Sequence, residues 1–369
     1  MSLYVDIEKR LGAFCLKAAF ETENEVFAIL GASGCGKSMT LKCIAGIERP
    51  DRGVIRLDGR TLFDSEKHID LPARKRRIGY LFQDYALFPN MTVFENILCG
   101  AGDRDLAAEL AARFYLEGKE QLYPSQLSGG QKQRVALARM LAAKPDYLLL
   151  DEPFSAMDNY LKSRLERELM EVLDDYGRRA LFVSHDRNEV YRLTDRIAVM
   201  ENGEVADIRP KRELFEAPRT LAATLLTGCK NVTGLEYRKE GLYALDWGIY
   251  LRTAEAEALS GTAWRYAAVR AHYFEAVTEP PERSEADLSK DGETTRYNLL
   301  QCEILREIED TFSMVILFRN PRGEQTGDYA VLTAEFSKEE WADIRERTIL
   351  QSRPLWLRIP EQKIILMER

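Results

Sequence analysis

Residues 25–45 read EVFAILGASGCGKSMTLKCIA. The first six, from Glu25 to Leu30, have the apolar character of a short buried strand. The next eight, from Gly31 to Ser38, fit the pattern G-x-x-x-x-G-K-[ST], and a helix is predicted from Lys37 to Ala45. A strand, a glycine-rich turn and a helix in this order form the opening unit of a parallel α/β sheet.

The chemistry of phosphate binding accounts for the residue types in this turn. Small residues let backbone amides wrap phosphate oxygens, and the helix points its positive dipole end at the anion. We expect Lys37 to reach the β- and γ-phosphates of ATP and the Ser38 hydroxyl to ligate Mg²⁺. The residues predicted to bind the phosphates are Gly31, Ala32, Ser33, Gly34, Cys35, Gly36, Lys37, Ser38 and Met39.

Two acids follow a second apolar strand, at 147–150. We expect the first, Asp151, to hold Mg²⁺ through its coordination shell. The second, Glu152, can polarise an attacking water as a general base. An acid pair at a strand end is often only a helix cap or a solvated turn, but a phosphate-binding loop on the same chain favours the catalytic interpretation.

Further along the chain, predicted strands and helices alternate. Helices are predicted at 106–116 and 161–176, and a hairpin at 197–208 around Asn202-Gly203. This order predicts an α/β fold with helices on a mostly parallel sheet. Beyond residue 228 short β-rich segments dominate, and all four tryptophans lie there. We therefore expect an ATP-binding domain at 1–228 and a smaller β-rich domain at 229–369.

Composition narrows the classes of function. The 369 residues carry 52 Lys and Arg against 60 Asp and Glu, and this net charge of -8 disfavours nucleic acid as a ligand. The densest basic run, at 74–77, is interpreted as a solvated surface. No CxxC pair occurs among the six cysteines, which we expect to be reduced thiols. Without a long apolar run or a signal-peptide core, we expect a cytoplasmic protein whose membrane association comes through a partner.

The run Leu127-Ser128-Gly129-Gly130-Gln131-Lys132-Gln133-Arg134 resembles the LSGGQ signature motif of the ABC transporter ATPase family. Ser128 and the amides that follow it are predicted to cap a helix starting at about Gln131, which makes a second anion-binding helix end. The resemblance implies that this end faces the γ-phosphate held by a partner subunit, so that the functional unit is a homodimer. The residues implied in this contact are Ser128, Gly129, Gly130 and Gln131.

Other residues match the family's motifs in order. Gln83 matches the glutamine that contacts Mg²⁺ and the attacking water, and His185 matches the histidine that contacts the γ-phosphate. Asp158 lies in a matching loop, Ser155 to Asp158, with Met157 where leucine is usual. Phe14 is the nearest candidate to stack on adenine, although it can equally be a core residue. The resemblance thus implies Glu152, His185 and Gln83 as catalytic residues and Ser38, Gln83 and Asp151 at the metal.

Two segments resemble the import branch of the family. Residues 83–96, QDYALFPNMTVFEN, are similar to importer ATPases for oxyanions, sugars, iron and polyamines. The C-terminal region resembles the OB-like (TOBE) barrel of such proteins, with Ala271 and His272 replacing the usual Pro and Glu in its strand at 266–272. The resemblance implies permease subunits as partners, an extracytoplasmic binding protein reached through them, and a location at the cytoplasmic face of the membrane.

The transported solute is open to several interpretations. Residues 59–80 look most like molybdate-import ATPases, which favours molybdate or tungstate. Sulfate or thiosulfate comes next, and iron(III), polyamines or sugars stay possible. A soluble ABC ATPase of translation or DNA repair is a distant alternative, because the chain shows one LSGGQ motif and no coiled-coil insertion. The C-terminal domain is either a dimerisation platform or a sensor of the transported oxyanion.

Overall fold

The computed structural model describes residues 2–154, 159–253, 264–277, 287–288, 294–324, 329–348 and 353–368. The chain forms two compact units, Met1–Leu214 and Phe215–Arg369. Within the described residues, no helix is long and apolar enough to cross a bilayer.

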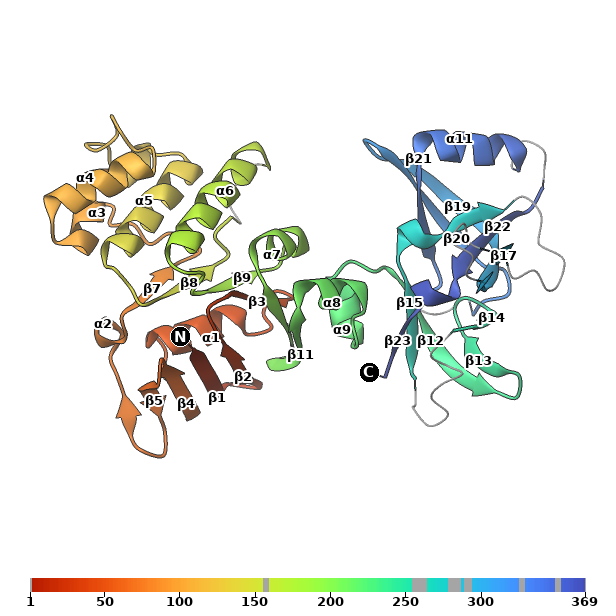
Figure 1. Ribbon diagram of the computed structural model, residues 1–369, viewed down its shortest axis with the longest axis horizontal. Helices are drawn as coiled ribbons and strands as arrows, with labels where there is room; N and C mark the ends of the chain where they lie inside the picture. Colours follow the sequence, from red (N-terminus) through yellow and green to blue (C-terminus); the bar gives the residue numbers. More distant parts are fainter. Residues whose placement is uncertain are drawn as a thin grey trace. The chain divides into compact units, whose positions relative to one another are not determined.

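A large mixed sheet runs through the first unit (Figure 1). Its described strands are β1 (Leu3–Leu11), β2 (Phe14–Thr22), β3 (Val26–Gly31), β4 (Arg52–Leu57), β5 (Arg60–Asp64), β6 (Ile69–Asp70), β7 (Ile78–Leu81), β8 (Tyr147–Asp151), β9 (Ala180–Ser184), β10 (Arg196–Glu201) and β11 (Glu204–Pro210). Their order is β6-β5-β4-β1-β2-β11-β10-β3-β9-β8-β7. β10, β3, β9, β8 and β7 are parallel neighbours, whereas β1 pairs antiparallel with β2 and β4. The parallel sheet expected from the sequence is therefore the half that carries the glycine-rich loop.

The burial of the strands follows their place in the sheet. β3, β8 and β9 are buried along their whole length, as expected for parallel strands covered on both faces. β1 instead alternates, with Leu3, Val5 and Ile7 buried and Asp6 and Glu8 exposed. This alternation is typical of an antiparallel strand with one solvated face.

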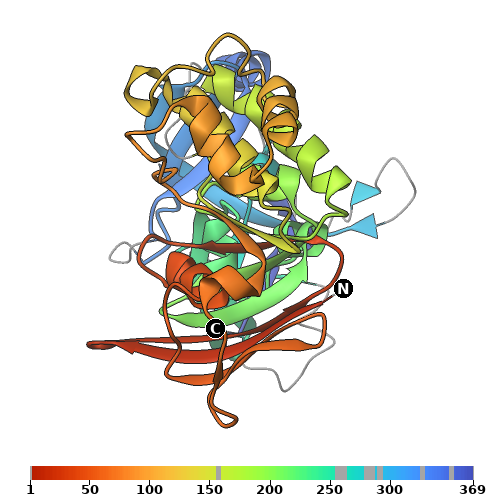
Figure 2. The ribbon, with the colours of Figure 1, turned by 90° about the vertical axis from the view of Figure 1, so that its left-hand side faces the viewer.

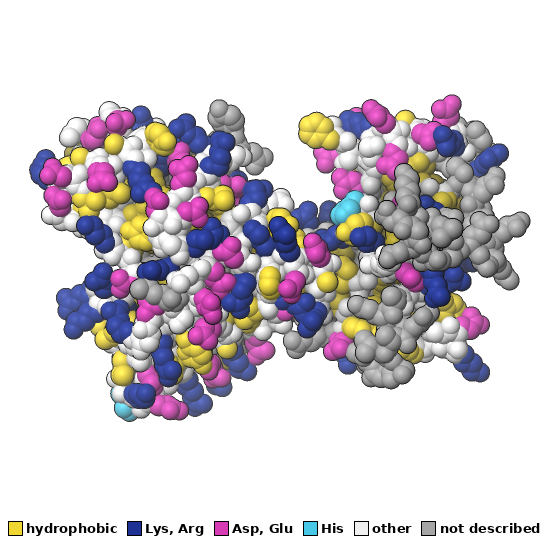
Figure 3. Space-filling model, viewed as in Figure 1, with side chains coloured by type: hydrophobic (Ala, Val, Ile, Leu, Met, Phe, Trp, Pro, Cys, Tyr) yellow, Lys and Arg dark blue, Asp and Glu magenta, His cyan; other side chains and the backbone are white. Residues whose placement is uncertain are grey.

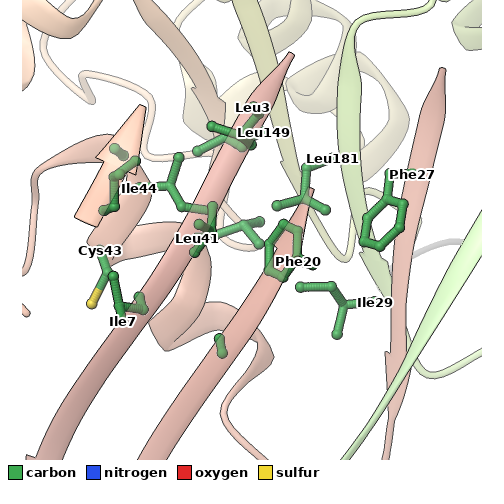
Figure 4. Packing of buried hydrophobic residues seen from close by; sticks show 14 of the residues in the cluster. Leu3, Ile7, Phe20, Phe27, Ile29, Leu41, Cys43, Ile44, Leu149 and Leu181 are labelled. Atoms are coloured by element: carbon green, nitrogen blue, oxygen red, sulfur yellow. The ribbon is translucent and has the colours of Figure 1, made fainter. Parts of the chain in front are cut away.

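The helix after the glycine-rich loop, α1 (Lys37–Ala45), is anchored in the core of this unit. Figure 4 shows Leu41 and Ile44 of α1 among side chains that come from several strands, including Leu149 of β8 and Leu181 of β9. Burying each such leucine or isoleucine side chain stabilises the fold by about 1.5–3 kcal/mol. The core thus fixes the helix whose N-terminus faces the loop.

The remaining helices of this unit are α2 (Ala73–Arg76), α3 (Val93–Ala101), α4 (Arg104–Arg113), the short 3₁₀ turn η1 (Pro124–Gln126), α5 (Gly129–Ala142), α6 (Asn159–Asp175) and α7 (Arg187–Leu193), with α8 (Lys211–Glu216) at its end. In Figures 1 and 2, α3, α4 and α5 gather on the side of the unit away from β1, β2 and β4. Thr92 and Glu95 form a capping box that starts α3 at Val93, within the segment 83–96 that resembles importer ATPases.

The basic run at 74–77 is not wholly a solvated surface, which corrects the expectation from the sequence. Arg76 is completely buried. Its guanidinium donates to the carbonyls of Cys43 and Ile44 at the C-terminal end of α1, and to Leu71 O and Asp70 Oδ1. Arg76 therefore satisfies orphan carbonyls and stabilises the negative end of the helix dipole.

The second unit is β-rich. It contains α9 (Leu221–Leu226), β12 (Asn231–Arg238), β13 (Gly241–Ala244), β14 (Ile249–Tyr250), β15 (Tyr266–Val269), η2 (Ala271–Tyr273), β16 (Glu275–Val277), β17 (Asp287–Leu288), β18 (Thr294–Thr295), β19 (Tyr297–Glu309), β20 (Ser313–Arg319), β21 (Leu332–Ser337), α11 (Lys338–Arg347), β22 (Leu355–Pro360), η4 (Glu361–Lys363) and β23 (Ile365–Met367). Its described strands form the sheets β14-β13-β12-β15-β23 and β16-β22-β19-β20-β21, with a separate pair β17-β18. The OB-like barrel expected here stays a prediction.

This unit begins before the boundary expected at 228/229. α9 accounts for the difference, since Leu221 packs on the cluster around Cys229 and Met367. The Thr224 hydroxyl also donates to Met367 Sδ at 2.9 Å. Figure 3 shows acidic and basic side chains interspersed over the visible face of each unit, so on this face the negative net charge is not gathered in one patch.

Candidate active site

The glycine-rich loop leaves β3 and enters α1 through backbone conformations that favour glycine. Gly34 and Gly36 have φ values of 81° and 109°. A Cβ atom at Gly36 would lie 2.8 Å from Leu16 Cδ1 and 3.3 Å from Phe14 Cζ. A Cβ at Gly31 would lie 2.5 Å from the carbonyl oxygen of Met200. The loop is therefore closely packed on the core through Gly31 and Gly36, while Ala32, Ser33 and Gly34 are exposed.

The start of α1 offers donors to an anion. Its N-cap, Gly36, has no capping side chain, so the first amides of the helix are not satisfied by one. Lys37 is 5% exposed, and its ammonium donates to Gly31 O at 2.8 Å and Ala32 O at 2.9 Å. Cys35 lies beside it and burial raises the pKa of its thiol, whereas Met39 packs on the core. The loop and α1 thus bring together all nine residues expected at the phosphates.

The first acid, Asp151, is held by two hydroxyl groups. Ser38 Oγ donates to Asp151 Oδ1 at 2.8 Å, and Tyr80 Oη donates to Asp151 Oδ2 at 2.8 Å. Burial, and then the nearby Asp151 carboxylate, raise the pKa of Tyr80 far above its ordinary value, so its hydroxyl stays protonated and remains a donor. The sequence placed Ser38 and Asp151 together but missed Tyr80, since nothing in the pattern of β7 reveals a hydroxyl partner across the sheet.

The second acid, Glu152, lies between the two other residues expected to be catalytic. Gln83 Nε2 donates to Glu152 Oε2 at 3.4 Å, and His185 Nδ1 lies 3.3 Å from Glu152 Oε1. Glu152 adopts a left-handed backbone conformation with φ of 46°. Its side chain is 15% exposed, whereas that of His185 is 55% exposed. A partly buried carboxylate is therefore flanked by two more accessible polar side chains.

Sheet topology explains this convergence. Gln83, Glu152 and His185 follow the carboxyl ends of β7, β8 and β9, which are parallel neighbours. Ligands of open α/β sheets bind outside the carboxyl ends of the strands. A cavity of about 110 Å³ next to Glu152 and His185 extends toward Lys162 and Glu189.

The signature segment folds as a capped helix start. Ser128 is the N-cap of α5, its Oγ accepts from Gln131 N, and Gln131 Oε1 accepts from Ser128 N at 2.9 Å. The helix begins at Gly129 rather than at Gln131. Within the described part of this single chain, no hydrogen bond or ion pair joins 128–131 to the loop at 31–39.

Phe14 and Asp158 are the other two residues expected to contact the nucleotide. Phe14 is half-buried at the start of β2 and packs on the core, with its ring tip close to Gly36 and Gly203. Asp158, with the rest of its loop at 155–158, lies outside the described residues.

The chain is similar to a known family and to several known proteins. The ABC transporter family matches residues 21–155. The sulfate/thiosulfate import ATP-binding protein CysA of Synechocystis sp. is 35% identical over 339 residues, which cover 88% of this chain and 90% of that protein. The Fe(3+) ions import ATP-binding protein FbpC of Haemophilus influenzae is 40% identical over 212 residues, which cover 55% of this chain and 60% of that protein.

Among solved structures, "Dimeric structure of a post-hydrolysis state of the ATP-binding cassette MJ0796 bound to ADP and Pi" is 28% identical, with a TM-score of 0.49. It covers 57% of this chain and 99% of that chain. The match to the Synechocystis protein along nearly its whole length, together with the ATPase cassette of the first unit, shows that the chain belongs to the ABC transporter family as an ATP-binding protein of the import type.

Proposed function

We propose that the chain is the ATP-hydrolysing subunit of an ABC importer that takes up an oxyanion. The observation that carries the proposal is the convergence of Gln83, Glu152 and His185 beside the Ser38–Asp151 pair. These residues come from four places in the sequence and meet where a sheet of this kind binds its ligand.

The residues fit ATP with Mg²⁺. A Cβ at Gly36 would clash with Leu16, so the loop lies tightly on the core at this point, and the donors of α1 and Lys37 suit phosphate oxygens. Ser38 and Asp151 supply the oxygen ligands that Mg²⁺ prefers, and Gln83 adds a third. When bound, Mg²⁺ would neutralise charge on the β- and γ-phosphates. The half-buried ring of Phe14 is our candidate for the contact with adenine.

In this mechanism Glu152 accepts a proton from the attacking water, which Gln83 orients. His185 contacts the γ-phosphate. Lys37 exchanges its bonds to loop carbonyls for bonds to the β- and γ-phosphates. Positioned donors supply most of the stabilisation in phosphoryl transfer, so the arrangement of these side chains matters more than covalent chemistry.

A second copy of the chain completes the site in our proposal. Among the described residues, the capped end of α5 at Ser128–Gln131 makes no hydrogen bond to this chain's own phosphate loop, which fits a role at the nucleotide of a partner. Asp158 is proposed to act at the same interface. Each ATP would then lie between two chains, and binding would close the homodimer.

The segment from Gln83 to Phe88 is our candidate for the contact with the permease. Arg139 of α5 donates to the carbonyls of Tyr85 and Ala86, two residues with positive φ. Its guanidinium also lies over the ring of Phe88, which is 45% exposed. The segment is thus rigidly held next to Gln83 and presents an aromatic side chain. The importer would sit at the cytoplasmic face of the membrane and receive its solute from an extracytoplasmic binding protein through the permease.

The solute itself has two candidates. Similarity of residues 59–80 to molybdate-import ATPases favours molybdate or tungstate. The match to a sulfate/thiosulfate import protein over 90% of its length favours sulfate or thiosulfate. Both are oxyanions, and we place molybdate first. For the second unit we propose a dimerisation role; measurable heat on titration with molybdate would replace that role with oxyanion sensing.

Uptake of labelled molybdate and sulfate, in cells carrying the wild-type chain or Glu152→Gln, tests the proposal. We expect the variant to abolish molybdate uptake and leave sulfate uptake intact at equal protein level. Loss of sulfate uptake alone would keep the ATPase role and change the solute. If both ions still enter, the proposal of an oxyanion importer is wrong.

A further inference from the structure

A group of partly buried charges lies next to His185. The ammonium of Lys162, on α6, is 2.6 Å from Asp186 Oδ2 and 2.5 Å from Glu189 Oε1. The Lys162 side chain is 16% exposed and that of Glu189 is 5% exposed. One cation thus neutralises two carboxylates that would otherwise repel each other, one of them buried and the other 30% exposed.

These contacts hold the backbone on both sides of His185. Ser184 Oγ donates to Glu189 Oε2 at 2.6 Å and accepts from Asp186 N at 2.9 Å. Asp186 caps α7 through its other oxygen, Oδ1, which accepts from Asn188 N. Although burial alone would raise the pKa of Asp186, its bonds to Lys162 and the helix amides hold that pKa below the ordinary value. The residues before and after His185 therefore depend on one ammonium group.

Within the described residues, Glu152 is the charged neighbour of the His185 ring. The side chain of His185 is more than half exposed, and its ring nitrogen lies beside Glu152 Oε1. Lys162, Asp186 and Glu189 line the same small cavity as Glu152 and His185. A shift of the loop would therefore move the imidazole relative to the catalytic base, and a displacement of about 1 Å at a reacting group can cost about 100-fold in rate.

We propose that Lys162 is a positioning residue for His185, which it acts on through Asp186 and Glu189. The inference rests on the role proposed above for His185 in hydrolysis. The competing interpretation is that Lys162 only stabilises the packing of α6 on α7, with no special effect on the imidazole.

Single-turnover hydrolysis by the purified full-length chain separates the two. We expect Lys162→Met to lower the rate by about tenfold or more with unchanged ATP affinity, because only the geometry of the site changes. In a His185→Ala background the same substitution should have no further effect, as expected for residues acting as one unit. Lys162→Arg should restore most of the rate. Arg164→Met, which removes a half-exposed cation from the same helix, is the matched control and should keep the wild-type rate.

A second readout needs no nucleotide. The chain has three histidines, His68, His185 and His272, so side-chain NMR of labelled histidine gives three signals, and His185→Ala identifies the relevant one. Lys162→Met should shift or broaden the His185 signal and leave the other two in place. If Lys162→Met does not fold, Glu189→Gln, which keeps the shape of the side chain, should produce the same two effects.

Each other outcome has a definite meaning. An unchanged rate and an unchanged His185 signal in Lys162→Met would overturn the inference. So would an equal loss of rate in the wild-type and His185→Ala backgrounds. If His185→Ala itself hydrolyses ATP at the wild-type rate, the role proposed for His185 is wrong, and the inference falls with it for that separate reason.

Discussion

The buried guanidinium of Arg76 gives the sharpest prediction about stability. Arg76→Met keeps the aliphatic stem of the side chain but removes its hydrogen bonds to Cys43 O, Ile44 O and Leu71 O, which are 2.7–2.8 Å long. It also removes the bond to Asp70 Oδ1. Hydrogen bonds to charged groups contribute about 1.5–3 kcal/mol each. Because Cys43 O keeps its bond from Gly46 N and Asp70 is partly solvated, the loss falls short of the full sum. We expect about 3–5 kcal/mol, the range for removing one partner of a buried charged pair.

The chain offers an internal control for this measurement. All four tryptophans lie in the second unit, so tryptophan fluorescence follows that unit alone during urea unfolding. Circular dichroism follows the helices, most of which, in the described residues, lie in the first unit. With an m-value of about 2–3 kcal/mol/M, the circular dichroism midpoint of Arg76→Met should fall by roughly 1–2.5 M while the fluorescence midpoint stays in place.

Arg74→Met is the matched control, because Arg74 belongs to the same basic run and is exposed. Its effect should lie within about 0.5 kcal/mol of zero. The reasoning is refuted if Arg76→Met unfolds like the wild type. It is equally refuted if the fluorescence transition moves as far as the circular dichroism transition.

Three further predictions concern the nucleotide site. Tyr80→Phe removes the hydroxyl that orients Asp151, so the Mg²⁺ concentration for half-maximal nucleotide binding should rise by about tenfold. If the variant needs the same Mg²⁺ concentration as the wild type, Tyr80 is dispensable. Gly36→Ala forces a Cβ against Leu16 at a left-handed φ. Calorimetry should therefore detect no ATP binding to a chain that still folds. An ATP affinity equal to that of the wild type would contradict the role proposed for the loop in phosphate binding. Ser128→Arg replaces the N-cap of α5 with a bulky side chain. In a Glu152→Gln background, which should hold ATP without hydrolysing it, Ser128→Arg should abolish ATP-dependent dimerisation in size-exclusion chromatography, whereas a dimer of normal yield would remove this helix end from the interface.

Local chemistry made part of the structure predictable. The strand, loop and helix of 25–45 are confirmed, because apolar runs and a glycine pattern with a phosphate-binding function leave few alternatives. The hairpin around Asn202 and Gly203 is also confirmed, and both residues have the positive φ that such a turn requires.

Long-range contacts explain what the sequence did not reveal. Arg76 looked like its exposed neighbours because its burial depends on the end of α1, more than 30 residues away in the chain. The partners of Tyr80 and Lys162 likewise come from other strands and helices, and only the fold brings them together. Gln83, Glu152 and His185 were expected at one site from family resemblance, and the order β9-β8-β7 gives the physical reason for their proximity.

The most direct test of the account is ATP turnover by the purified chain with Glu152→Gln, measured beside its ATP affinity. The substitution keeps the size of the side chain and removes the carboxylate that we propose takes the proton. General-base catalysis contributes about 10²–10⁴-fold. We therefore predict at least about a 100-fold fall in turnover with unchanged ATP binding. Turnover equal to that of the wild type would contradict the assignment of Glu152 as the base and, with it, the proposed mechanism.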